Sequence, residues 1–453
     1  MGNYIRSNEI VLLFDNYSID SQDLHQSFQM AGKDYPVVVI EEDGFLPEDV
    51  MSVYGFFLGD FINAKDLPGR PRYFNQINVP DYWEISANNS SGKIHDLSKE
   101  RGRIFYAEPA HKRLVKVVDW CDEKGIVRSS DHYNRYGALY ARTIFNAKGQ
   151  KVNKSYFSAE GREIIMENFV TGDIILNDGE EVKIFQTKTE FVLYFMKKAG
   201  LDQHRIFFNS LSTPFFVSQR MNSEWKEDVL FWQEPVGDSI PGNMQIILNG
   251  QSSRTGRIMV QKRNSYDRLL ELGASPSMVH RLGFVYPFKK ENGHKPEALI
   301  CTNSDRIAEC QKLVEALPEM HFHIAALTEM SSKLMSMGTY DNVTLYPGIK
   351  RTILDELFEK CDFYLDINYE SEIVSAVRQA FLHNHVILAF QETIHNRNYI
   401  AMDHIYKLDQ VDQMIMELKA LKEDPAYLEK HLIMQHAWAC AENTEKYQEN
   451  FYM

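Results

Sequence analysis

Acidic side chains follow directly on a short apolar run near the start of the chain. Residues 36–40 (PVVVI) have the continuous apolar character of a strand that is buried on both faces, and residues 41–47 (EEDGFLP) come immediately after them. In an open parallel sheet, side chains at the carboxyl ends of the strands line the edge at which ligands bind. Residues 41–47 are therefore a candidate binding loop, with carboxylates that can accept hydrogen bonds from a polar ligand.

The residues after this loop are rich in aromatic side chains, which would give flat apolar platforms beside the carboxylates. The candidates for ligand contact in this part of the chain are Glu41, Asp43, Phe45, Tyr54, Phe74 and Trp83. An alternative is that the aromatic side chains pack a following β-rich segment against the first sheet. The sequence leaves both interpretations open.

Charged and histidine side chains in the second half of the chain are weaker candidates. Arg306 and Lys312 could neutralise a diphosphate, but they also fit the solvated face of an amphipathic helix. His321 and His323 alternate on one face of a strand, and two histidines without a third ligand nearby do not indicate a metal site. The chain contains no G-x-S-x-G, H-E-x-x-H or P-loop motif. We expect no metal.

A strand–helix–strand unit opens the chain and would carry the candidate loop. Residues 10–14 are a continuous apolar run, Asp20 can cap a helix that ends near Ala31, and Gly32 is a natural stop. With residues 36–40 as the second strand, this order is the beginning of a doubly wound parallel sheet.

The pattern changes to short strand-like segments between about residues 73 and 189. Segments rich in Val, Ile, Tyr and Phe, such as 138–145 and 154–157, alternate with turn clusters, and Asn-Asp-Gly at 177–179 is a good hairpin signal. We expect an antiparallel β-meander inserted into the first α/β domain. The outer strands of such a sheet have unpaired backbone groups that can pair with another chain.

Helix–strand alternation resumes after the meander, with a helix expected over residues 190–198, and it continues beyond a linker at 285–296. Strands before the linker are expected over 205–209, 229–231, 244–248 and 257–260. Helices after it are expected over 306–317, 352–360 and 373–382. The chain is then α/β, with two Rossmann-like domains whose cleft would bind a nucleotide on one wall and a second substrate on the other.

The expected domain boundaries follow from these changes of pattern. They are 1–72 with 190–284 for the first Rossmann-like domain, 73–189 for the inserted β-sheet add-on domain, 285–410 for the second Rossmann-like domain, and 411–453 for C-terminal helices.

Composition narrows the class of protein. The chain has 453 residues and a formal charge of −14, which argues against a nucleic-acid binder. Its five cysteines are scattered, without a C-x-x-C pair, so neither a disulfide framework nor a zinc site is expected. The first residues lack the apolar core of a signal peptide, and no apolar run approaches the length that spans a membrane. We expect a cytoplasmic protein, with peripheral attachment to a membrane left open.

The second α/β unit resembles the donor half of retaining GT-B glycosyltransferases. The similar segments are 342–348 (NVTLYPG), 363–368 (FYLDIN) and 380–388 (AFLHNHVIL). In these enzymes a signature of Glu, seven residues, Glu supplies carboxylates that hydrogen-bond the donor sugar and the nucleotide ribose. Here the two glutamate positions fall on Ser371 and Gln379.

The glycine-rich elbow between the two glutamates is also missing from this chain. Residues 372–377 read EIVSAV, with bulky side chains where a sugar and a diphosphate need close approach to the backbone. We therefore expect a degenerate donor site at Ser371 and Gln379 and no catalytic residues.

The first half of the chain resembles one particular family more closely. The segments are 41–47 (EEDGFLP), 54–59 (YGFFLG), 73–76 (YFNQ) and 79–85 (VPDYWEI). They are similar to glycosyltransferase-stabilising protein B (GtfB), the chaperone subunit of the two-subunit O-GlcNAc transferase that modifies serine-rich repeat adhesins in Gram-positive bacteria. The resemblance extends along essentially the whole chain.

The resemblance implies a GT-B fold with a β-sheet add-on domain and a hetero-oligomer with a homologous catalytic subunit. That partner would use UDP-GlcNAc to modify Ser and Thr of an unfolded adhesin before export by the accessory Sec system, so this subunit needs no cofactor of its own. The leading hypothesis is a non-catalytic subunit that binds the acceptor polypeptide. One alternative is an active retaining GT-B glycosyltransferase that uses a UDP-sugar, and another is a scaffold that only stabilises its partner.

Overall fold

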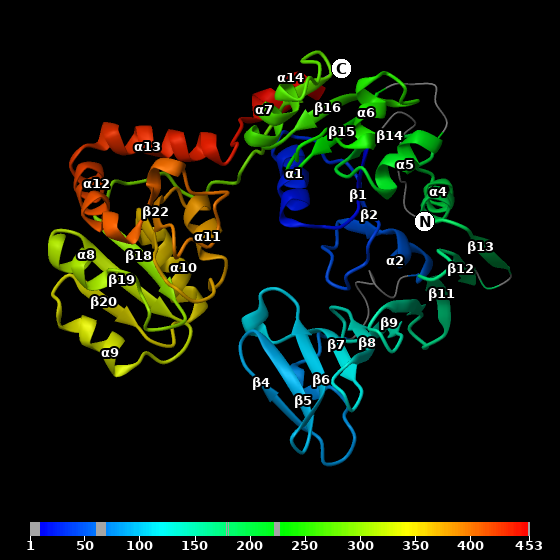
Figure 1. Ribbon diagram of the computed structural model, residues 1–453, viewed down its shortest axis with the longest axis horizontal. Helices are drawn as coiled ribbons and strands as arrows, with labels where there is room; N and C mark the ends of the chain where they lie inside the picture. The colour runs from blue at the N-terminus through cyan, green and yellow to red at the C-terminus, as the bar shows by residue number, and fades with distance from the viewer. Residues whose placement is uncertain (1–9, 60–68, 178, 180, 222–226, 452–453) are drawn as a thin grey trace. The chain divides into compact units, whose positions relative to one another are not determined.

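The computed structural model (Figure 1) describes residues 10–59, 69–177, 179, 181–221 and 227–451. The chain divides into two compact units, Met1–Val260 with Asn264–Arg281, and Gln261–Arg263 with Leu282–Met453. Within the described ranges, the first unit holds a parallel 7-stranded sheet and an antiparallel 10-stranded sheet, and the second holds a parallel 6-stranded sheet. The expected α/β class with an added antiparallel sheet is confirmed.

The first sheet has apolar strands that are buried on both faces. All five residues of β1 are buried, as in other parallel sheets covered by helices. The strands are β1 (Ile10–Phe14), β2 (Val37–Val39), β3 (Val50–Ser52), β14 (Arg205–Phe208), β15 (Asp228–Trp232), β16 (Thr255–Val260) and β17 (Val279–Arg281). The helices are α1 (Ile19–Met30), α2 (Val53–Phe57), α4 (Lys188–Lys198), α5 (Thr213–Arg220), α6 (Gly242–Leu248) and α7 (Arg263–Glu271). The spatial order is β17-β16-β15-β14-β1-β2-β3, so the direction of winding changes between β1 and β14.

Two details of this unit differ from the expectation. The first helix is capped by Ser18, whose hydroxyl accepts a hydrogen bond from the Ser21 amide, and Asp20 lies inside the first turn. The strand expected over 244–248 is wrong, because those residues belong to α6. Met244 and Ile247 are three positions apart and both buried, so a short apolar run that suits a strand equally suits one face of a short helix.

The inserted sheet is a meander in which each strand pairs with its neighbours in sequence. Its strands are β4 (Glu84–Ala87), β5 (Ser91–Asp96), β6 (Lys99–Tyr106), β7 (Val115–Cys121), β8 (Val127–Tyr133), β9 (Leu139–Phe145), β10 (Lys151–Phe157), β11 (Glu163–Asn168), β12 (Ile174–Asn177) and β13 (Val182–Phe185). Asp178, in the predicted turn between β12 and β13, lies outside the described residues, but the two strands pair antiparallel as expected.

The meander contributes to two separate hydrophobic cores. Strands β9 to β12 supply Tyr140, Tyr156 and Ile165 to the main core of the unit, where they join Phe191 and Phe195 of α4. Strands β5 to β8 surround a smaller cluster of their own, which we call the outer core: Ile77, Ile94, Ile104, Tyr106, Val115, Val118 and Tyr133. One half of the sheet is therefore tied to the parallel sheet, and the other half projects from it (Figure 1).

The second unit has helices packed on its parallel sheet, with the order β20-β19-β18-β21-β22-β23. The strands are β18 (Glu297–Thr302), β19 (His321–Ala326), β20 (Val343–Tyr346), β21 (Phe363–Asp366), β22 (Val386–Phe390) and β23 (Ile405–Tyr406). The helices are α8 (Cys310–Ala316), α9 (Ser332–Met335), α10 (Arg351–Lys360), α11 (Ala376–Leu382), α12 (Val411–Glu423), α13 (Pro425–Trp438) and α14 (Thr444–Phe451). Across the described part of the chain, no helix is long and apolar enough to cross a membrane.

Two helices of this unit begin later than predicted. The helix expected from residue 306 begins at Cys310, because Glu309 has a left-handed φ of 49° that interrupts the helical turn. The helix expected from residue 373 begins at Ala376 for the same reason, since Ser375 has a φ of 52°. Arg306 therefore lies in a loop and not on a helix face.

Candidate functional site

The predicted binding loop lies at the carboxyl end of β2, where residues 41–47 leave the first sheet. The Glu41 amide donates a 2.8 Å hydrogen bond to the Asp15 carbonyl just after β1. Asp43 accepts a 2.8 Å hydrogen bond from the Phe45 amide and lies 2.9 Å from the Lys116 ammonium group on β7. The Arg135 guanidinium, on the β8–β9 turn, donates to the Phe45 carbonyl at 2.9 Å. The loop is thus held between the parallel sheet and the meander.

Gly44 makes this close packing possible. Its φ is +79°, in the left-handed region, and a Cβ atom placed on it would lie 2.7 Å from the Tyr133 carbonyl oxygen and 2.8 Å from a ring carbon of Tyr140. Tyr133 belongs to the outer core and Tyr140 to the main core. The loop therefore crosses the meander where the two cores meet, and it needs a residue without a side chain at that point.

Glu41 is part of a compact cluster of charges behind the loop. Lys188, at the start of α4, lies 2.5 Å from Glu41 and 2.9 Å from Glu167 on β11. Burial opposes the charge of Lys188, but the two carboxylates outweigh it and raise the pKa of its ammonium group. The neighbouring Glu42 is almost fully buried, and burial raises the pKa of its carboxyl group.

Tyr54 is a correction to the predicted set of contact residues. Its side chain has an exposed fraction of 0%, its ring stacks on Tyr156 with centroids 4.4 Å apart, and its hydroxyl donates to Glu167 at 3.2 Å. A side chain without exposed surface cannot touch a peptide in this conformation. Tyr54 joins α2 to the meander and supports the loop from below.

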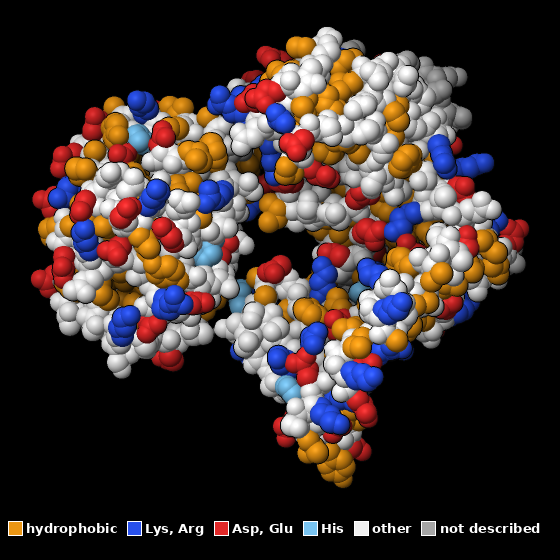
Figure 2. All heavy atoms as spheres, in the orientation of Figure 1, with side chains coloured by type: hydrophobic (Ala, Val, Ile, Leu, Met, Phe, Trp, Pro, Cys, Tyr) orange, Lys and Arg blue, Asp and Glu red, His pale blue; other side chains and the backbone are white. Residues whose placement is uncertain are grey.

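Phe74 and Trp83 lie apart from Tyr54, because both pack against the outer core, where they are half-buried. The Arg113 guanidinium lies 5.7 Å from the Phe74 ring, and that of Arg101 lies 5.1 Å from the Trp83 ring. Of the predicted contact residues, the structure brings Glu41, Asp43 and Phe45 together, and it places Phe74 and Trp83 on the projecting half of the sheet. In Figure 2, basic side chains on that half are interspersed with acidic and apolar ones.

Ser371 and Gln379, the residues predicted to stand at the two glutamate positions, lie in the second unit. Ser371 is exposed in the loop between β21 and α11, and its side chain has no carboxylate. Gln379 lies on α11 and accepts a 3.0 Å hydrogen bond from the Lys289 ammonium group. Neither residue can provide the charged acceptor that the signature supplies to a sugar hydroxyl.

The cations that could have neutralised a diphosphate are paired within the protein. Arg306 lies 3.0 Å from Glu370, and its guanidinium lies 5.2 Å from the Tyr369 ring. Lys312 lies 2.8 Å from Asp412. Both pairs are largely exposed, so each contributes little to stability, but a phosphate would have to compete with a carboxylate for each cation.

The elbow before α11 keeps a left-handed backbone although it has no glycine. Val374 and Ser375 have φ values of 50° and 52°, and a β-branched residue such as valine rarely adopts this region. Glu372 stabilises the turn by accepting a 2.8 Å hydrogen bond from the Val377 amide in the first turn of the helix. The bend therefore persists, while side chains occupy the space that glycine leaves open in a donor site.

The loop at residues 369–371 is fixed by His395. The imidazole lies 2.5 Å from the Asp366 carboxylate through Nδ1 and 2.5 Å from the Glu370 carbonyl through Nε2. Burial by itself would lower the pKa of His395, but the hydrogen bond and the charge of Asp366 outweigh it and raise the pKa to about 9. A protonated imidazole donates to both partners, which closes the loop over the end of β21.

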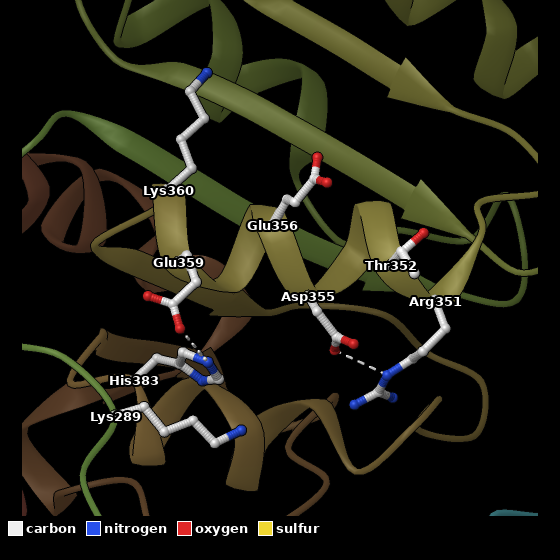
Figure 3. A pocket seen from close by; sticks show the side chains of 8 residues that line it. All are labelled: Lys289, Arg351, Thr352, Asp355, Glu356, Glu359, Lys360 and His383. Carbon is white, nitrogen blue, oxygen red and sulfur yellow. Dashed lines mark ion pairs between the residues drawn. The ribbon is translucent and has the colours of Figure 1, made fainter.

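A groove of about 610 Å³ runs along α10 on the surface of the second unit (Figure 3). It is lined by Lys289, Arg351, Thr352, Asp355, Glu356, Glu359, Lys360 and His383. Arg351 lies 2.9 Å from Asp355, and His383 lies 3.4 Å from Glu359, so cations and carboxylates largely satisfy one another. The groove follows a helix face and does not lie at the carboxyl ends of the strands, so it is not the position of a donor site.

The histidine pair of β19 is held by the protein itself. His321 hydrogen-bonds Thr344 at 2.8 Å, and His323 lies 2.5 Å from Glu297 and 3.0 Å from the Tyr346 hydroxyl. In the described ranges no group of three or more His, Cys, Asp or Glu side chains could hold a metal ion.

Sequence comparison identifies four known domain families along the chain. They are described as the GtfB N-terminal domain (residues 11–57), the GtfB middle domain (83–186), the GtfB third domain (188–272) and the GftB/GlyA-F C-terminal domain (298–435).

Two relatives that match over nearly their whole length have the same name. The chain is 43% identical over 442 residues to the UDP-N-acetylglucosamine–peptide N-acetylglucosaminyltransferase stabilizing protein GtfB of Streptococcus agalactiae, covering 97% of this chain and 98% of the relative. It is 42% identical over 444 residues to the protein of the same name in Streptococcus pneumoniae, with 97% and 98% covered.

Solved structures agree with this relationship. A chain of a crystal structure of the GtfA/B complex bound to UDP and GlcNAc superposes with a TM-score of 0.89 at 40% identity, covering 97% of this chain and 99% of that chain. The glycosyltransferase TarM is similar in fold, with a TM-score of 0.50 at 11% identity and 98% of both chains covered. The expected GT-B architecture is therefore confirmed.

Proposed function

The chain belongs to the GtfB family, the stabilizing proteins of a peptide N-acetylglucosaminyltransferase, and from this premise we propose that it is the non-catalytic subunit that holds the acceptor polypeptide for a catalytic glycosyltransferase. Its relatives are named as stabilizing proteins of the transferase. A chain of a GtfA/B complex superposes on it with a TM-score of 0.89. The catalytic partner corresponds to GtfA.

The observation that carries the non-catalytic role is the state of the donor edge in the second unit. By the sequence resemblance, Ser371 and Gln379 stand where the two glutamates are expected, and Arg306 is paired with Glu370. A GT-B enzyme stabilises a departing diphosphate with cations, and that electrostatic contribution is usually the largest part of catalysis. With Arg306 and Lys312 both paired to carboxylates and no glutamate at Ser371 or Gln379, this edge is unsuited to sugar transfer. We infer that UDP-GlcNAc is bound by the partner and that this subunit uses no cofactor.

The first unit offers the chemistry that an extended polypeptide needs. In the loop from Glu41 to Phe45, the carboxylates of Glu41 and Asp43 are each paired with a lysine but stay partly exposed beside an aromatic ring. The meander ends in outer strands β4 and β13. Peptide backbone amides and Ser or Thr hydroxyls are donors that carboxylates accept, and a strand edge offers backbone hydrogen bonds. An acidic chain, with a formal charge of −14, also suits an uncharged or basic polypeptide better than an acidic one.

The finer assignments rest on the sequence resemblance. We infer that the acceptor is an unfolded Ser/Thr-rich adhesin, that modification takes place in the cytoplasm before export, and that the complex can associate with the inner face of the membrane. In this proposal the subunit holds the acceptor while it is assembled with the catalytic subunit in a hetero-oligomer.

The test is binding of the purified chain, by itself, to two labelled probes: an unglycosylated serine-rich repeat peptide and UDP-GlcNAc. The proposal expects peptide binding and no saturable nucleotide binding. Failure to bind the peptide would favour a scaffold that only stabilises its partner, whereas tight nucleotide binding would contradict the non-catalytic assignment. A catalytic homologue measured beside it provides the positive control for nucleotide binding.

A further inference from the structure

The first sheet changes its direction of winding between β1 and β14, and the crevice outside such a point is where open α/β sheets bind ligands. The strands are adjacent and parallel, with Leu13 opposite Phe208. The polar residues that follow them are Asp15 after β1 and Asn209 after β14. Sequence reasoning missed Asn209, because nothing in its local sequence shows that its strand lies beside β1.

The amide of Asn209 has its orientation fixed by its neighbours. Its Nδ2 group donates to Ser21 Oγ and to Gln233 Oε1, both at 2.9 Å. Both partners are themselves oriented, since Ser21 Oγ donates to the Asn16 carbonyl and Gln233 Nε2 donates to the Asp20 carbonyl, again at 2.9 Å. With both donor hydrogens of Asn209 in use, its other terminal atom must be the oxygen.

That oxygen has no hydrogen-bond partner among the residues that the structure describes. Asn209 is 8% exposed, and its carbonyl oxygen itself has almost no accessible surface, so a donor reaches this oxygen only when a neighbouring side chain moves aside. A buried acceptor without a donor is costly, and such atoms are uncommon in native proteins. A chain of oriented amides that ends in an unmatched acceptor at the carboxyl end of a parallel strand makes this oxygen a candidate partner for a donor from a ligand.

The second sheet provides an internal comparison. Its direction changes between β18 and β21, and Asn368 follows β21 there as Asn209 follows β14. Asn368 Oδ1 accepts from the Thr302 hydroxyl at 2.9 Å, and its Nδ2 donates to the Glu370 carbonyl at 3.0 Å. Among the residues that the structure describes, the protein's own groups therefore satisfy Asn368 and leave the Asn209 oxygen without a donor.

The surroundings of Asn209 indicate the chemistry of the missing donor. Asp15 follows the adjacent strand β1, where its carboxylate accepts a hydrogen bond from the Ser212 hydroxyl and its carbonyl accepts from the Glu41 amide. A carboxylate beside the crevice disfavours phosphate and other anions. The hydrogen bond from the Glu41 amide to the Asp15 carbonyl joins the end of β1 to the binding loop described above.

We propose that Asn209 Oδ1 accepts a hydrogen bond from an uncharged donor of the bound acceptor polypeptide, either a backbone N–H or a Ser or Thr hydroxyl. The proposal rests on the proposed function and adds a specific contact to it. Asn209 is thus a peptide-binding residue, and the amide chain through Gln233 to α1 holds it in position.

The experiment compares Asn209→Ala with Asn368→Ala in the full-length chain. Each substitution removes a buried asparagine that follows a strand at a winding change, so each is expected to lower thermal stability. Binding of a fluorescein-labelled serine-rich peptide is measured by fluorescence anisotropy at a temperature where all the proteins are folded. The peptide has about 20 residues, long enough to bind as an extended segment. One lost hydrogen bond is expected to weaken binding by about tenfold in Asn209→Ala and not in Asn368→Ala.

A second peptide, with every Ser and Thr replaced by Ala, separates the two donors. If Asn209→Ala still weakens binding of this peptide, the donor is a backbone N–H, and if the effect disappears, it is a hydroxyl. If Asn209→Ala does not fold, Asn209→Ser replaces it, since its short polar side chain no longer presents the amide oxygen.

Three outcomes would overturn the proposal in distinguishable ways. Equal binding by the parent chain and Asn209→Ala would reject this contact and leave the proposed function intact. Equal weakening in Asn209→Ala and Asn368→Ala would assign the effect to general loss of stability. No peptide binding by the parent chain would reject the proposed function, and this inference with it.

Discussion

Glu370 holds Arg306 in an ion pair of 3.0 Å at the edge of the second sheet where a GT-B enzyme binds its donor. The pair is exposed, so its contribution to stability is small, but its position is informative. The protein supplies its own anion to the cation that a diphosphate would otherwise need. Together with the valine and serine in the elbow before α11, this pair is a second difference from the expected donor site, beyond the two glutamates.

Restoring the two glutamates should therefore not restore catalysis. Ser371→Glu with Gln379→Glu returns the carboxylates, but Val374 and Ser375 still occupy the elbow and Glu370 still binds Arg306. We expect UDP-GlcNAc turnover by the double variant to equal that of the parent chain, measured as released UDP. Turnover clearly above that background would show that the carboxylates were the only missing element.

Gly44→Ala should be strongly destabilising. The added methyl group would meet the Tyr133 carbonyl at 2.7 Å in a left-handed backbone, and we expect a loss of about 3 kcal/mol in the free energy of unfolding. Gly161→Ala is the matched control, because Gly161 has a φ of +78° with open space around it, and it should cost only about 1 kcal/mol. Urea unfolding measures both, and equal losses would contradict the close packing of the loop.

The ion pair of Asp228 and Arg254 should be essential to the first unit. Both side chains are 1% exposed and 2.9 Å apart, so Asp228→Ala leaves a buried guanidinium without its carboxylate. We expect a loss of about 3–5 kcal/mol by urea unfolding. Asp355→Ala removes the exposed partner of Arg351 and should cost less than about 0.5 kcal/mol. A small effect of Asp228→Ala would mean that water reaches Arg254.

Stability should fall as the pH rises through the pKa of His395. That pKa is raised from 6.5 to about 9, so the folded protein binds a proton that the unfolded chain releases. The stabilisation is fully present below pH 6.5 and is lost as the pH passes about 9. After allowance for screening by solvent, we expect roughly 2 kcal/mol.

The measurement is urea unfolding of the parent chain and of His395→Gln at pH 6.5 and at pH 9.5, which bracket the titration. His395→Gln should be less stable at the lower pH and should lose this part of the pH dependence. An identical pH dependence in both proteins would show that His395 is not the group that titrates.

Much of the fold could be predicted because its apolar patterns are local. The five consecutive apolar residues of β1 and the alternating pattern of the meander strands are local sequence patterns, and each predicts a strand without reference to distant segments. The failures came where a short pattern suits two structures, as in α6, or where a single left-handed residue such as Glu309 ends a helix early. No propensity rule identifies such a residue unless it is glycine or asparagine.

The candidate site was only partly accessible to sequence reasoning. The loop at Glu41 to Phe45 follows from the position of its strand, but whether a given aromatic ring faces a ligand or a core depends on packing between distant segments. Tyr54 is buried by Tyr156, about a hundred positions later, and the sequence holds no signal of that contact. Asn209 was missed for the same reason, because its significance depends on which strand lies beside its own.

The order of strands has a consequence for folding during synthesis on the ribosome. Each meander strand pairs with the strand made just before it, so this sheet can assemble progressively as it emerges. Strand β1 is made before the meander, yet its neighbour β14, with Phe208 opposite Leu13, is synthesised only after the whole meander. We expect the apolar β1 to remain half-paired throughout that interval, which makes translation of the first half of the chain the period of greatest exposure to aggregation.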